Sequence, residues 1–378
     1  MQNKNSYYKI LTIIFIAAIG GVTVLNTLSP VKDFSESENR VLSKSPKFTF
    51  ERLVDGRYTK KYEKYKTDQF IGRDFFMAIK SCSDLMLGKK NNNSVYLADD
   101  GYLIEDFSPI SDEKIKANLT SINNFAKKYK DSKTTFAIVP TAISIFDEKL
   151  PSFSPVKNQN TYIKSFYDNL DPNINSVDLY NTLYNSRDEY LYYKTDHHWT
   201  SLAASKAYET IKKEMQLDNV ESTFIAKTIT TDFNGTLASK SGFRGNSTDS
   251  IDVYLNNNKD LKVLYSNSTD KMPTLYDTSK LEGKDKYALF LSGNHPEITI
   301  KTTARTTDSI IVFKDSYANC FIPFLAEHYS KITVIDPRYY YDDLYKLMEE
   351  NQYDDILFLY NANTFFSDTS IEPVLKNE

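Results

Sequence analysis

The first sustained apolar pattern in the chain is a run without charge. Residues 10–25, ILTIIFIAAIGGVTVL, follow Lys4 and Lys9. This length is near the lower limit for a membrane-spanning helix, and the core of a long signal peptide has a similar composition. Apolar residues continue to Leu28 and no clean A-x-A cleavage site is present, so we expect an uncleaved anchor over residues 1–29. The lysines before the run predict that the rest of the chain faces the cell exterior.

Polar and helical patterns come next. Residues 30–47 are polar and punctuated by proline and serine, which predicts a linker. Residues 50–87 have apolar residues at helical spacing and predict a helical stretch with a broad apolar face. Two short alternating runs then flank the pair Asp100-Gly101, which predicts a β-hairpin. We expect these elements to open one domain that spans residues 48–378.

From residue 110 onward, helical periods alternate with short buried runs. Helices are expected over residues 111–129, 160–170, 200–216, 317–329 and 341–352, and strands over 134–140, 176–180, 309–313, 331–336 and 355–360. Residues 220–305 are rich in Asn, Ser, Thr and Asp with short β-like runs, which predicts a β-rich insertion. The alternation predicts an α/β fold in which helices flank a parallel sheet.

Composition narrows the classes of function. A net charge of −4 without a basic stripe argues against a nucleic-acid-binding protein. The 28 tyrosines and 23 phenylalanines suit sugar stacking, and they equally suit ordinary core packing. Two cysteines, Cys82 and Cys320, form neither a disulfide framework nor a CxxC metal motif, and we expect both to be free thiols.

Ser316 is the first candidate for chemistry. It lies in FKDSY, where an apolar β-branched strand runs directly into a helix start. Ligands of parallel sheets bind at the carboxyl ends of the strands, so a serine there is a candidate nucleophile near helix N–H groups that stabilise an oxyanion. The alternative is that Ser316 is only a helix N-cap. A nucleophilic serine also requires a base from elsewhere in the chain.

The stretch YYKTDHHWT, residues 192–200, is the candidate source of that base. Strand-like geometry would place Asp196 and His198 on one face and His197 on the other. Asp196 would then orient the His198 ring, as in a Ser-His-Asp triad, and Trp199 would wall the site or stack on a sugar. A metal site is a second interpretation, because Asp and His are both ligands, and a structural helix start is a third.

Further candidates follow the ends of neighbouring strands. Asn361 and Asn363 come after the final strand, and an amide there is able to donate to an oxyanion or bind substrate. An ordinary Asn-rich turn is the alternative. Arg338 follows the strand over residues 331–336 and either pairs with Asp336, which we favour, or contacts substrate. Tyr317, next to Ser316, is a further candidate for substrate binding.

Taken together, these motifs resemble the DHHW protein family, named after the tetrapeptide at 196–199. Supporting stretches are ESENRVL near 36–42, YEKYKTDQFIGRD at 62–74, the DGYLIE hairpin, FNGTLASKSGF at 233–243, IIVFKDSYANCFIPFL at 311–325 and ITVIDPRYY at 332–340. The family is similar to SGNH-like proteins that O-acetylate alginate and other exported polysaccharides. The resemblance implies an SGNH-hydrolase-like (flavodoxin-like) fold with a circularly permuted motif order, because the Asp-His pair precedes the serine. The usual SGNH glycine and asparagine blocks are not recognisable.

Carried over to this sequence, the resemblance implies that Ser316 is the nucleophile, His198 the base and Asp196 the orienting acid. The expected function is an O-acetyltransferase that modifies an exported cell-surface polysaccharide through an acetyl-serine intermediate. Alternatives are a polysaccharide acetylesterase and a non-catalytic carbohydrate-binding component of an export complex. We expect no cofactor and no metal. Expected partners are a polysaccharide acceptor and a membrane-bound O-acyltransferase that supplies acetyl groups, with the catalytic domain outside the cytoplasm on a single-pass anchor.

Overall fold

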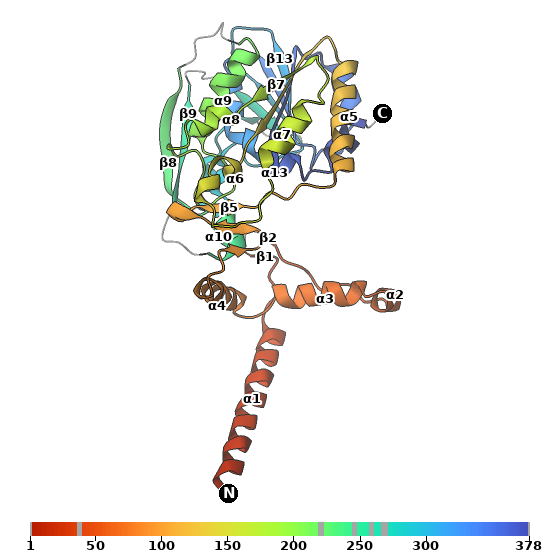
Figure 1. The fold of residues 1–378 in the computed structure, drawn as a ribbon. Coiled ribbons are helices and arrows are strands. Elements are labelled where there is room, and N and C mark those ends of the chain that lie inside the picture. The colour runs from red at the N-terminus through yellow and green to blue at the C-terminus, as the bar shows by residue number, and fades with distance from the viewer. Residues whose placement is uncertain are drawn as a thin grey trace. The chain divides into compact units, whose positions relative to one another are not determined.

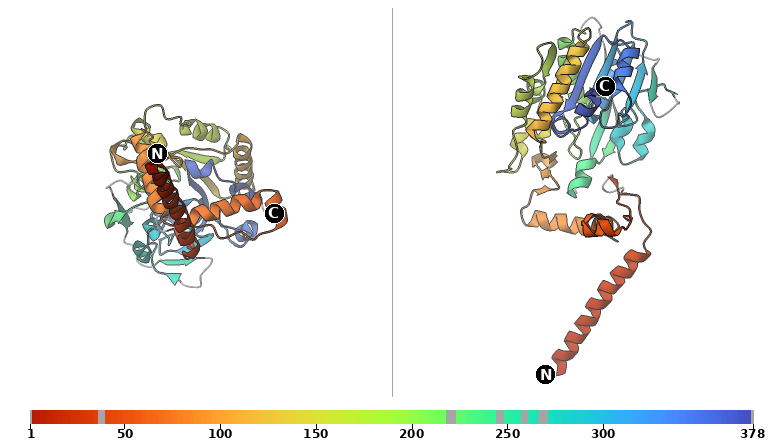
Figure 2. Two further views of the ribbon diagram at one scale, coloured as in Figure 1. Left: turned by 90° about the horizontal axis from the view of Figure 1, so that it is seen from below. Right: turned by 90° about the vertical axis from the view of Figure 1, so that its right-hand side faces the viewer.

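The chain divides into two compact units in a computed structural model, Met1–Lys89 and Lys90–Glu378. The structure describes residues 2–35, 40–217, 223–243, 248–256, 261–265 and 271–376. Figure 1 shows the ribbon coloured along the chain, and Figure 2 adds two further views. Most of the ESENRVL stretch lies outside the described residues.

The first unit begins with the expected apolar helix, α1 (Gln2–Leu28). Its segment Ser6–Leu28 is long and apolar enough to cross a membrane, a property that signal sequences share. The predicted linker contains a small antiparallel pair, β1 (Phe34–Ser35) with β2 (Arg40–Val41).

The predicted helical stretch 50–87 is divided into three helices, α2 (Phe50–Val54), α3 (Arg57–Asp68) and α4 (Arg73–Met86). The breaks fall at Gly56 and Gly72, which adopt positive φ angles of 75° and 68°. Glycine occupies this left-handed region without a steric penalty, so each one turns the chain between two helices.

An eight-stranded sheet forms the centre of the second unit, in the order β11-β10-β12-β14-β13-β15-β6-β7. Its members are β6 (Lys133–Val139), β7 (Ile174–Asp178), β10 (Lys262–Tyr265), β11 (Lys271–Met272), β12 (Glu297–Lys301), β13 (Ser309–Lys314), β14 (Lys331–Ile335) and β15 (Asp355–Asn361). The five strands from β14 to β7 are parallel, which confirms the predicted α/β fold with its parallel sheet. Strands β12, β10 and β11 extend the sheet in antiparallel fashion.

The predicted β-rich insertion therefore contributes to two sheets. Part of it, β10 to β12, is the antiparallel edge of the main sheet. The other part, β8 (Ile225–Phe233) and β9 (Asp249–Leu255), forms a separate antiparallel pair. The predicted hairpin is also present, with β4 (Val95–Leu97) paired to β5 (Leu103–Glu105) and β3 (Asn91–Asn92) beside β4.

Aromatic packing attaches the helices to the central strands. Phe136, Phe358 and Phe313 stack in a row across β6, β15 and β13, with ring centroids 5.4 and 4.8 Å apart. Helices α5 (Asp112–Lys128) and α7 (Gln159–Tyr167) cover this row through Phe125 and Phe166. Burial of these rings is a main hydrophobic contribution to the rigidity of the central strands.

The remaining helices of the second unit are short apart from α9. They are α6 (Ala142–Ile145), α8 (Tyr180–Tyr184), α9 (Ser201–Glu214), α10 (Thr236–Ser241), α11 (Ile322–Leu325), α12 (Leu344–Glu350), α13 (Ala362–Phe365) and α14 (Ile371–Lys376). The 3₁₀ turns are η1 (Asp99–Gly101), η2 (Asp147–Lys149), η3 (Thr278–Glu282), η4 (Lys286–Leu289) and η5 (Ser316–Cys320).

Two local predictions were wrong. The helix expected over residues 317–329 is a 3₁₀ turn, η5, followed by the single turn α11. The strand-like segment before the DHHW tetrapeptide is a loop, closed by an isolated bridge between Tyr192 and Trp199. The expected Thr200 cap is present and accepts from the Ala203 N–H at the start of α9.

Candidate active site

Ser316 lies in the sharp turn between β13 and η5. The N-cap of η5 is Asp315, whose carboxylate accepts from the Tyr317 N–H at 2.8 Å. The alternative in which Ser316 itself caps the helix is therefore wrong. Its Oγ lies 2.8 Å from Nε2 of His198 instead, and the serine is 8% exposed. The aspartate takes the capping function, so the serine hydroxyl remains available to an imidazole base.

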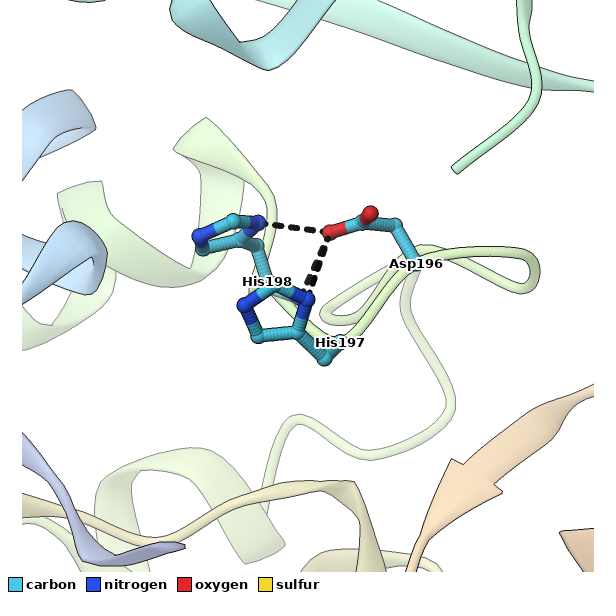
Figure 3. A group of neighbouring side chains, drawn as sticks. All are labelled: Asp196, His197 and His198. Carbon is cyan, nitrogen blue, oxygen red and sulfur yellow. Dashed lines mark hydrogen bonds and ion pairs between the residues drawn. The ribbon is translucent and has the colours of Figure 1, made fainter. Parts of the chain in front are cut away.

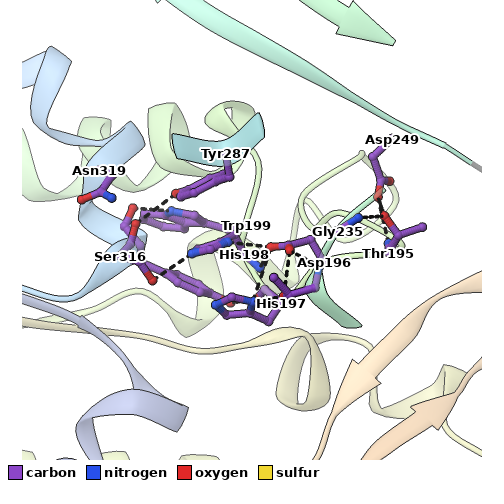
Figure 4. Close-up of polar contacts among 12 residues, drawn as sticks. Thr195, Asp196, His197, His198, Trp199, Gly235, Asp249, Tyr287, Ser316 and Asn319 are labelled. Carbon is purple, nitrogen blue, oxygen red and sulfur yellow. Dashed lines mark hydrogen bonds and ion pairs between the residues drawn. The ribbon is translucent and has the colours of Figure 1, made fainter. Parts of the chain in front are cut away.

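His198 and Asp196 come from the loop before α9. His198 Nδ1 lies 2.5 Å from Asp196 Oδ1, and the His198 backbone N–H donates to the same oxygen at 3.0 Å. Asp196, His198 and Ser316 thus form one hydrogen-bonded chain, which Figure 4 shows from the carboxylate to the hydroxyl. With Nδ1–H donating to the carboxylate, Nε2 is left as the acceptor for the serine proton.

Burial and charge determine how this pair titrates. Burial, together with the neighbouring His197, lowers the pKa of His198 to about 4 against the opposing effect of Asp196. Burial alone would raise the pKa of Asp196, but the two histidines and the hydrogen bonds from His198 and Thr236 outweigh it. The pKa of Asp196 therefore lies well below its usual range. At neutral pH the site combines a carboxylate with a neutral imidazole, as a general base requires.

His197 does not point away from the site, as strand geometry predicted. Figure 3 shows both imidazoles turned toward the same carboxylate oxygen. The His197 Nδ1 lies 3.5 Å from Asp196 Oδ1 and 2.8 Å from Thr236 Oγ1, and the two imidazole centroids are 3.9 Å apart. His197 lies on this side because the tetrapeptide is in a loop. Side chains alternate between two faces only in an extended strand.

The metal interpretation has its three donor residues in place. Asp196, His197 and His198 offer ligand atoms within 4.8 Å of one another. However, both Nδ1 atoms have protein partners, and His198 Nε2 faces the serine hydroxyl. A structural zinc site requires four ligands and a catalytic one leaves a position open for water. The hydrogen-bonding pattern favours the triad arrangement over a metal site.

The second carboxylate oxygen of Asp196 is held by residues 235 and 236. Thr236 donates to Oδ2 twice, from its N–H at 2.7 Å and from its hydroxyl at 2.9 Å. A Cβ on Gly235 would lie 2.2 Å from the Asp196 Cβ, so only glycine fits at that position. In the sequence, only the family resemblance marks FNGT, residues 233–236. In the structure, residues 235 and 236 hold the Asp196 carboxylate in place.

Asp249 accepts hydrogen bonds from the loop that precedes the DHHW tetrapeptide. This contact was not predicted from the sequence. The Asp249 carboxylate accepts from the N–H groups of Lys194 and Thr195, each at 2.8 Å, and from the Thr195 hydroxyl. Thr195 Oγ1 in turn accepts from the Gly235 N–H at 2.9 Å. No local pattern marks Asp249, because it lies on β9, about fifty residues beyond the loop it organises.

Tyr287 is a second residue that the sequence did not indicate. Its ring stacks on the His198 imidazole with centroids 3.6 Å apart and an interplanar angle of 10°. Its hydroxyl donates to the Ser316 carbonyl oxygen at 3.1 Å. Its segment, expected to be β-like, is the 3₁₀ turn η4. Tyr287 therefore fixes the plane of the proposed base and the backbone of the proposed nucleophile together.

Trp199 and Tyr317 are packed inside the protein. Neither side chain has measurable exposure, so Trp199 presents no face on which a sugar could stack. The Trp199 Nε1–H donates to the Tyr317 carbonyl at 2.9 Å, and the Tyr317 hydroxyl donates to the His197 carbonyl at 2.5 Å. These bonds tie the DHHW loop to the Ser316 turn. Trp199 supports the site from within the core, whereas Tyr317 also lines a small cavity beside Asp196 and His197.

The two asparagines also have structural partners. Asn361 caps α13 and donates its side-chain amide to Asp315 Oδ2 at 2.6 Å. The Asn363 side chain bonds to Gln159, Thr141 and the Asp106 carbonyl. Both line a cavity of about 30 Å³ beside Asp196 and His197, large enough for about one water. Neither amide bonds to Ser316, so the geometry gives no support to the predicted oxyanion role.

Arg338 pairs with Asp336, the alternative that the sequence favoured. The contact is bidentate, with Nε–Oδ1 at 2.8 Å and Nη2–Oδ2 at 2.6 Å. Lys314 lies 3.4 Å from the same carboxylate, is fully buried, and donates to Asn319 Oδ1 at 2.8 Å. Burial lowers the pKa of Lys314. Two basic groups thus share one carboxylate, and Lys314 is two residues before Ser316.

Comparison with known families identifies the chain. The sequence model described as DHHW protein matches residues 88–335, roughly two thirds of the chain. The chain belongs to the DHHW family. This DHHW protein shows no match among curated protein sequences.

Solved structures with TM-scores above 0.6 share its fold. A DHHW family protein from Eubacterium siraeum is 24% identical with a TM-score of 0.64, covering 76% of this chain and 96% of that one. Bacillus cereus PatB1, solved with a sulfonyl adduct, is 19% identical with a TM-score of 0.61, covering 75% and 99%. The O-acetyltransferase domain of Pseudomonas putida AlgJ is 14% identical with a TM-score of 0.47, covering 75% and 100%. The SGNH-like α/β fold expected from the sequence is confirmed.

Proposed function

We propose that this DHHW protein is an O-acetyltransferase that acetylates an exported cell-surface polysaccharide through an acetyl-serine intermediate. The observation that carries the proposal is the continuous hydrogen-bonded chain from Asp196 through His198 to the Ser316 hydroxyl. Such a chain activates serine for attack on an acyl group. The acetyl group is proposed from the resemblance of the sequence motifs to the DHHW family.

In the first half-reaction His198 Nε2 removes the Ser316 proton while Oγ attacks the carbonyl carbon of an acetyl donor. The carbonyl oxygen becomes an oxyanion, which the Ser316 N–H stabilises. The imidazolium returns its proton to the leaving group, and the donor departs. Asp196 holds the imidazole in the required tautomer and stabilises its positive charge.

In the second half-reaction a sugar hydroxyl enters the position of the departed donor. His198 takes its proton, the sugar oxygen attacks the acetyl carbon, and the bond to Oγ breaks as Ser316 recovers a proton from His198. The acetyl ester passes to the polysaccharide. Within this proposal α1 anchors the chain in the membrane, the catalytic unit faces outward, and a membrane-bound O-acyltransferase supplies the acetyl groups.

The test is acylation of the full chain by an aryl acetate. We expect release of the aryl group and a mass gain of one acetyl at Ser316. Ser316→Ala and His198→Ala should each abolish turnover to a similar extent, because residues that act as a unit are not additive. His197→Ala should lose less, because His197 lies beside the hydrogen-bonded chain rather than within it.

Ser330→Ala is a suitable control, since that serine lies just before β14, at the opposite end of the sheet strands from Ser316. Equal turnover by wild type and Ser316→Ala would refute the proposal in favour of a non-catalytic carbohydrate-binding protein. Adding candidate oligosaccharides then compares sugar with water as acceptor. Acetyl transfer to water alone would make the protein an esterase.

A further inference from the structure

Helix α4 turns its apolar side outward. Phe75, Ile79, Cys82 and Met86 are spaced by four, three and four residues, so they form one stripe along the helix. Phe75 is 64% exposed, Ile79 47% and Met86 88%, and Cys82 is also exposed. Ser81, on another side of the helix, is buried. Surface helices of globular proteins show the reverse arrangement, so this stripe requires an apolar partner.

The neighbouring elements add the composition of a lipid-facing surface. Phe48, Phe50 and Val54, in and before α2, are 61%, 75% and 73% exposed. Helix α3 carries five basic residues against two acidic ones. Exposed aromatic and aliphatic side chains next to lysines are typical of helices that lie in the interface of a bilayer with anionic lipid.

Hydrogen bonds fix this region to the end of α1. The Ile71 N–H donates to Asn26 Oδ1 at 2.7 Å, and Gln69 exchanges two hydrogen bonds with the backbone of Lys32, at 2.8 and 2.9 Å. Asn26 lies in the last turn of α1, whose segment Ser6–Leu28 is long enough to span a bilayer. The turn between α3 and α4 is therefore held at the depth where such a span leaves the lipid.

The polar cavity between the ends of α1 and α3 suits a lipid headgroup. It measures about 290 Å³ and lies between the last turns of α1 and the end of α3. Lys66, Gln69 and Asn26 line it together with the hydroxyl residues Thr27 and Ser29. A lysine among amide and hydroxyl groups suits the phosphate of a lipid headgroup.

We propose that α2, α3 and α4 lie on the surface of a bilayer that contains anionic phospholipid. The Phe75–Ile79–Cys82–Met86 stripe of α4 is inserted among the upper acyl chains, and the lysines of α3 face the headgroups. Two observations distinguish lipid from a second protein copy as the partner, namely the hydrogen-bonded attachment to the end of α1 and the basic character of α3. The inference goes beyond the proposed acetyl transfer and does not depend on it.

The native thiols permit a direct test with the full chain. Cys82 lies in the stripe and is exposed, whereas Cys320 is buried and burial raises the pKa of its thiol to about 12. A polarity-sensitive fluorophore on Cys82 should shift to the blue in vesicles of phosphatidylcholine and phosphatidylglycerol. Phospholipid brominated near the headgroup should quench it. The matched control is Lys80→Cys in a Cys82→Ser background, since two residues are about 200° apart around a helix, and this label should stay unquenched.

The charge and the stripe are tested separately. Vesicles of phosphatidylcholine alone, or replacement of Lys60, Lys61 and Lys64 by glutamine, should weaken quenching at Cys82. Phe75→Gln with Ile79→Gln should reduce both the blue shift and the quenching. Aryl acetate turnover measured on the same samples should not change, so loss of membrane contact and loss of catalysis are distinguishable.

Three outcomes would overturn the inference. A Cys82 label that stays in water in both lipid mixtures shows that the stripe has no lipid contact. If the label is shielded from water but not quenched by bromine, and this shielding increases with the protein-to-lipid ratio, the stripe contacts a second copy of the chain. Shielding without quenching at every ratio assigns it to another part of the same chain.

Discussion

Four donated hydrogen bonds converge on the carboxylate of Asp196. Oδ1 receives the His198 backbone and imidazole N–H groups, and Oδ2 receives the N–H and hydroxyl of Thr236. One oxygen therefore orients the proposed base while the other anchors the acid to a different segment of the chain. The position of the His198 ring therefore depends on Thr236, which belongs to a different segment of the chain.

Gly235 gives the clearest test of this anchoring. Gly235→Ala places a methyl group 2.2 Å from the Asp196 Cβ, so the DHHW loop must move and the His198 ring with it. We expect aryl acetate turnover to fall by about 10²-fold or more, because small displacements of catalytic groups are costly. Circular dichroism should show an intact fold.

The control is Gly283→Ala. Both glycines have an extended backbone that alanine also adopts, with φ of −80° and −86°. At Gly283 the nearest neighbour to a new Cβ is 3.6 Å away, an ordinary contact. Turnover should be unchanged in this variant. Equal effects at the two positions would mean that the contact with Asp196 does not position the site.

In the pH profile of kcat/KM, the decline on the acid side should occur at an unusually low pH. Because burial lowers the pKa of His198 to about 4, the imidazole stays neutral and basic well below its ordinary pKa of about 6.5. We expect kcat/KM for an aryl acetate to decline with a midpoint near pH 4. A midpoint at about 6.5 or above would contradict the structure.

Stability should depend on pH in the same direction. The unfolded imidazole binds a proton at higher pH than the folded one, so the folded state loses stability as pH falls from about 6.5 toward 4. The contribution of His198 is fully present above its unfolded pKa. In His198→Gln the acid-dependent loss of stability, followed by urea unfolding, should be smaller than in the wild type.

The elements that were predicted correctly are those encoded by local periodicity. The runs at 309–313, 331–336 and 355–360 became β13, β14 and β15 because β-branched and aromatic residues buried on both faces suit a parallel sheet. The segment before the DHHW tetrapeptide has similar composition, but Asp249 takes the Lys194 and Thr195 N–H groups that a strand ladder would need. That contact comes from a distant strand and leaves no local signal.

In the candidate site, too, residues with a local sequence signal were predicted and residues placed by distant contacts were not. Ser316, His198 and Asp196 were identified because their residue types and their place at strand ends carry chemical meaning. Tyr287 and Gly235 were not, because stacking on an imidazole and close backbone approach depend on packing between distant segments. The outward position assigned to His197 failed for a related reason, since the tetrapeptide lies in a bend and not in a strand.

Beyond the end of their ladder, β13 and β15 are linked by two hydrogen bonds to Asp315. Asn361, the last residue of β15, donates its backbone N–H and side-chain amide to Asp315 Oδ2 at 2.8 and 2.6 Å. Burial raises the pKa of Asp315 to about 6 despite these donors. Asn361→Ala removes one donor from a buried carboxyl, and we expect a loss of about 1–3 kcal/mol in unfolding free energy.

A double-mutant cycle checks whether this loss comes from the pair. In an Asp315→Asn background, Asn361→Ala should cost less, with a coupling of about 0.5–3 kcal/mol. The measurement is the urea midpoint at constant m-value. Additive losses would show that Asn361 acts only through the cap of α13.

At the scale of the whole molecule, the proposed chemistry resides in one compact unit. Residues 90–378 contain the sheet, the DHHW loop and the Ser316 turn, and their core is continuous across all of these elements. A chain that starts at Lys90 should therefore unfold cooperatively and keep aryl acetate turnover within about twofold of the full chain. Turnover that vanishes while thermal unfolding stays cooperative would mean that residues 1–89 complete the site.

Strand order has a consequence for how the protein is made. β15 is the last strand along the chain, yet it lies between β13 and β6 in the middle of the sheet. Until residue 361 has been synthesised, the strands on the β13 side of the sheet, which carry Ser316, cannot pair with β6 and β7 through β15. An incomplete chain should therefore hold its serine and its histidine apart and remain inert during synthesis. Its reactivity would begin only when the final strand inserts.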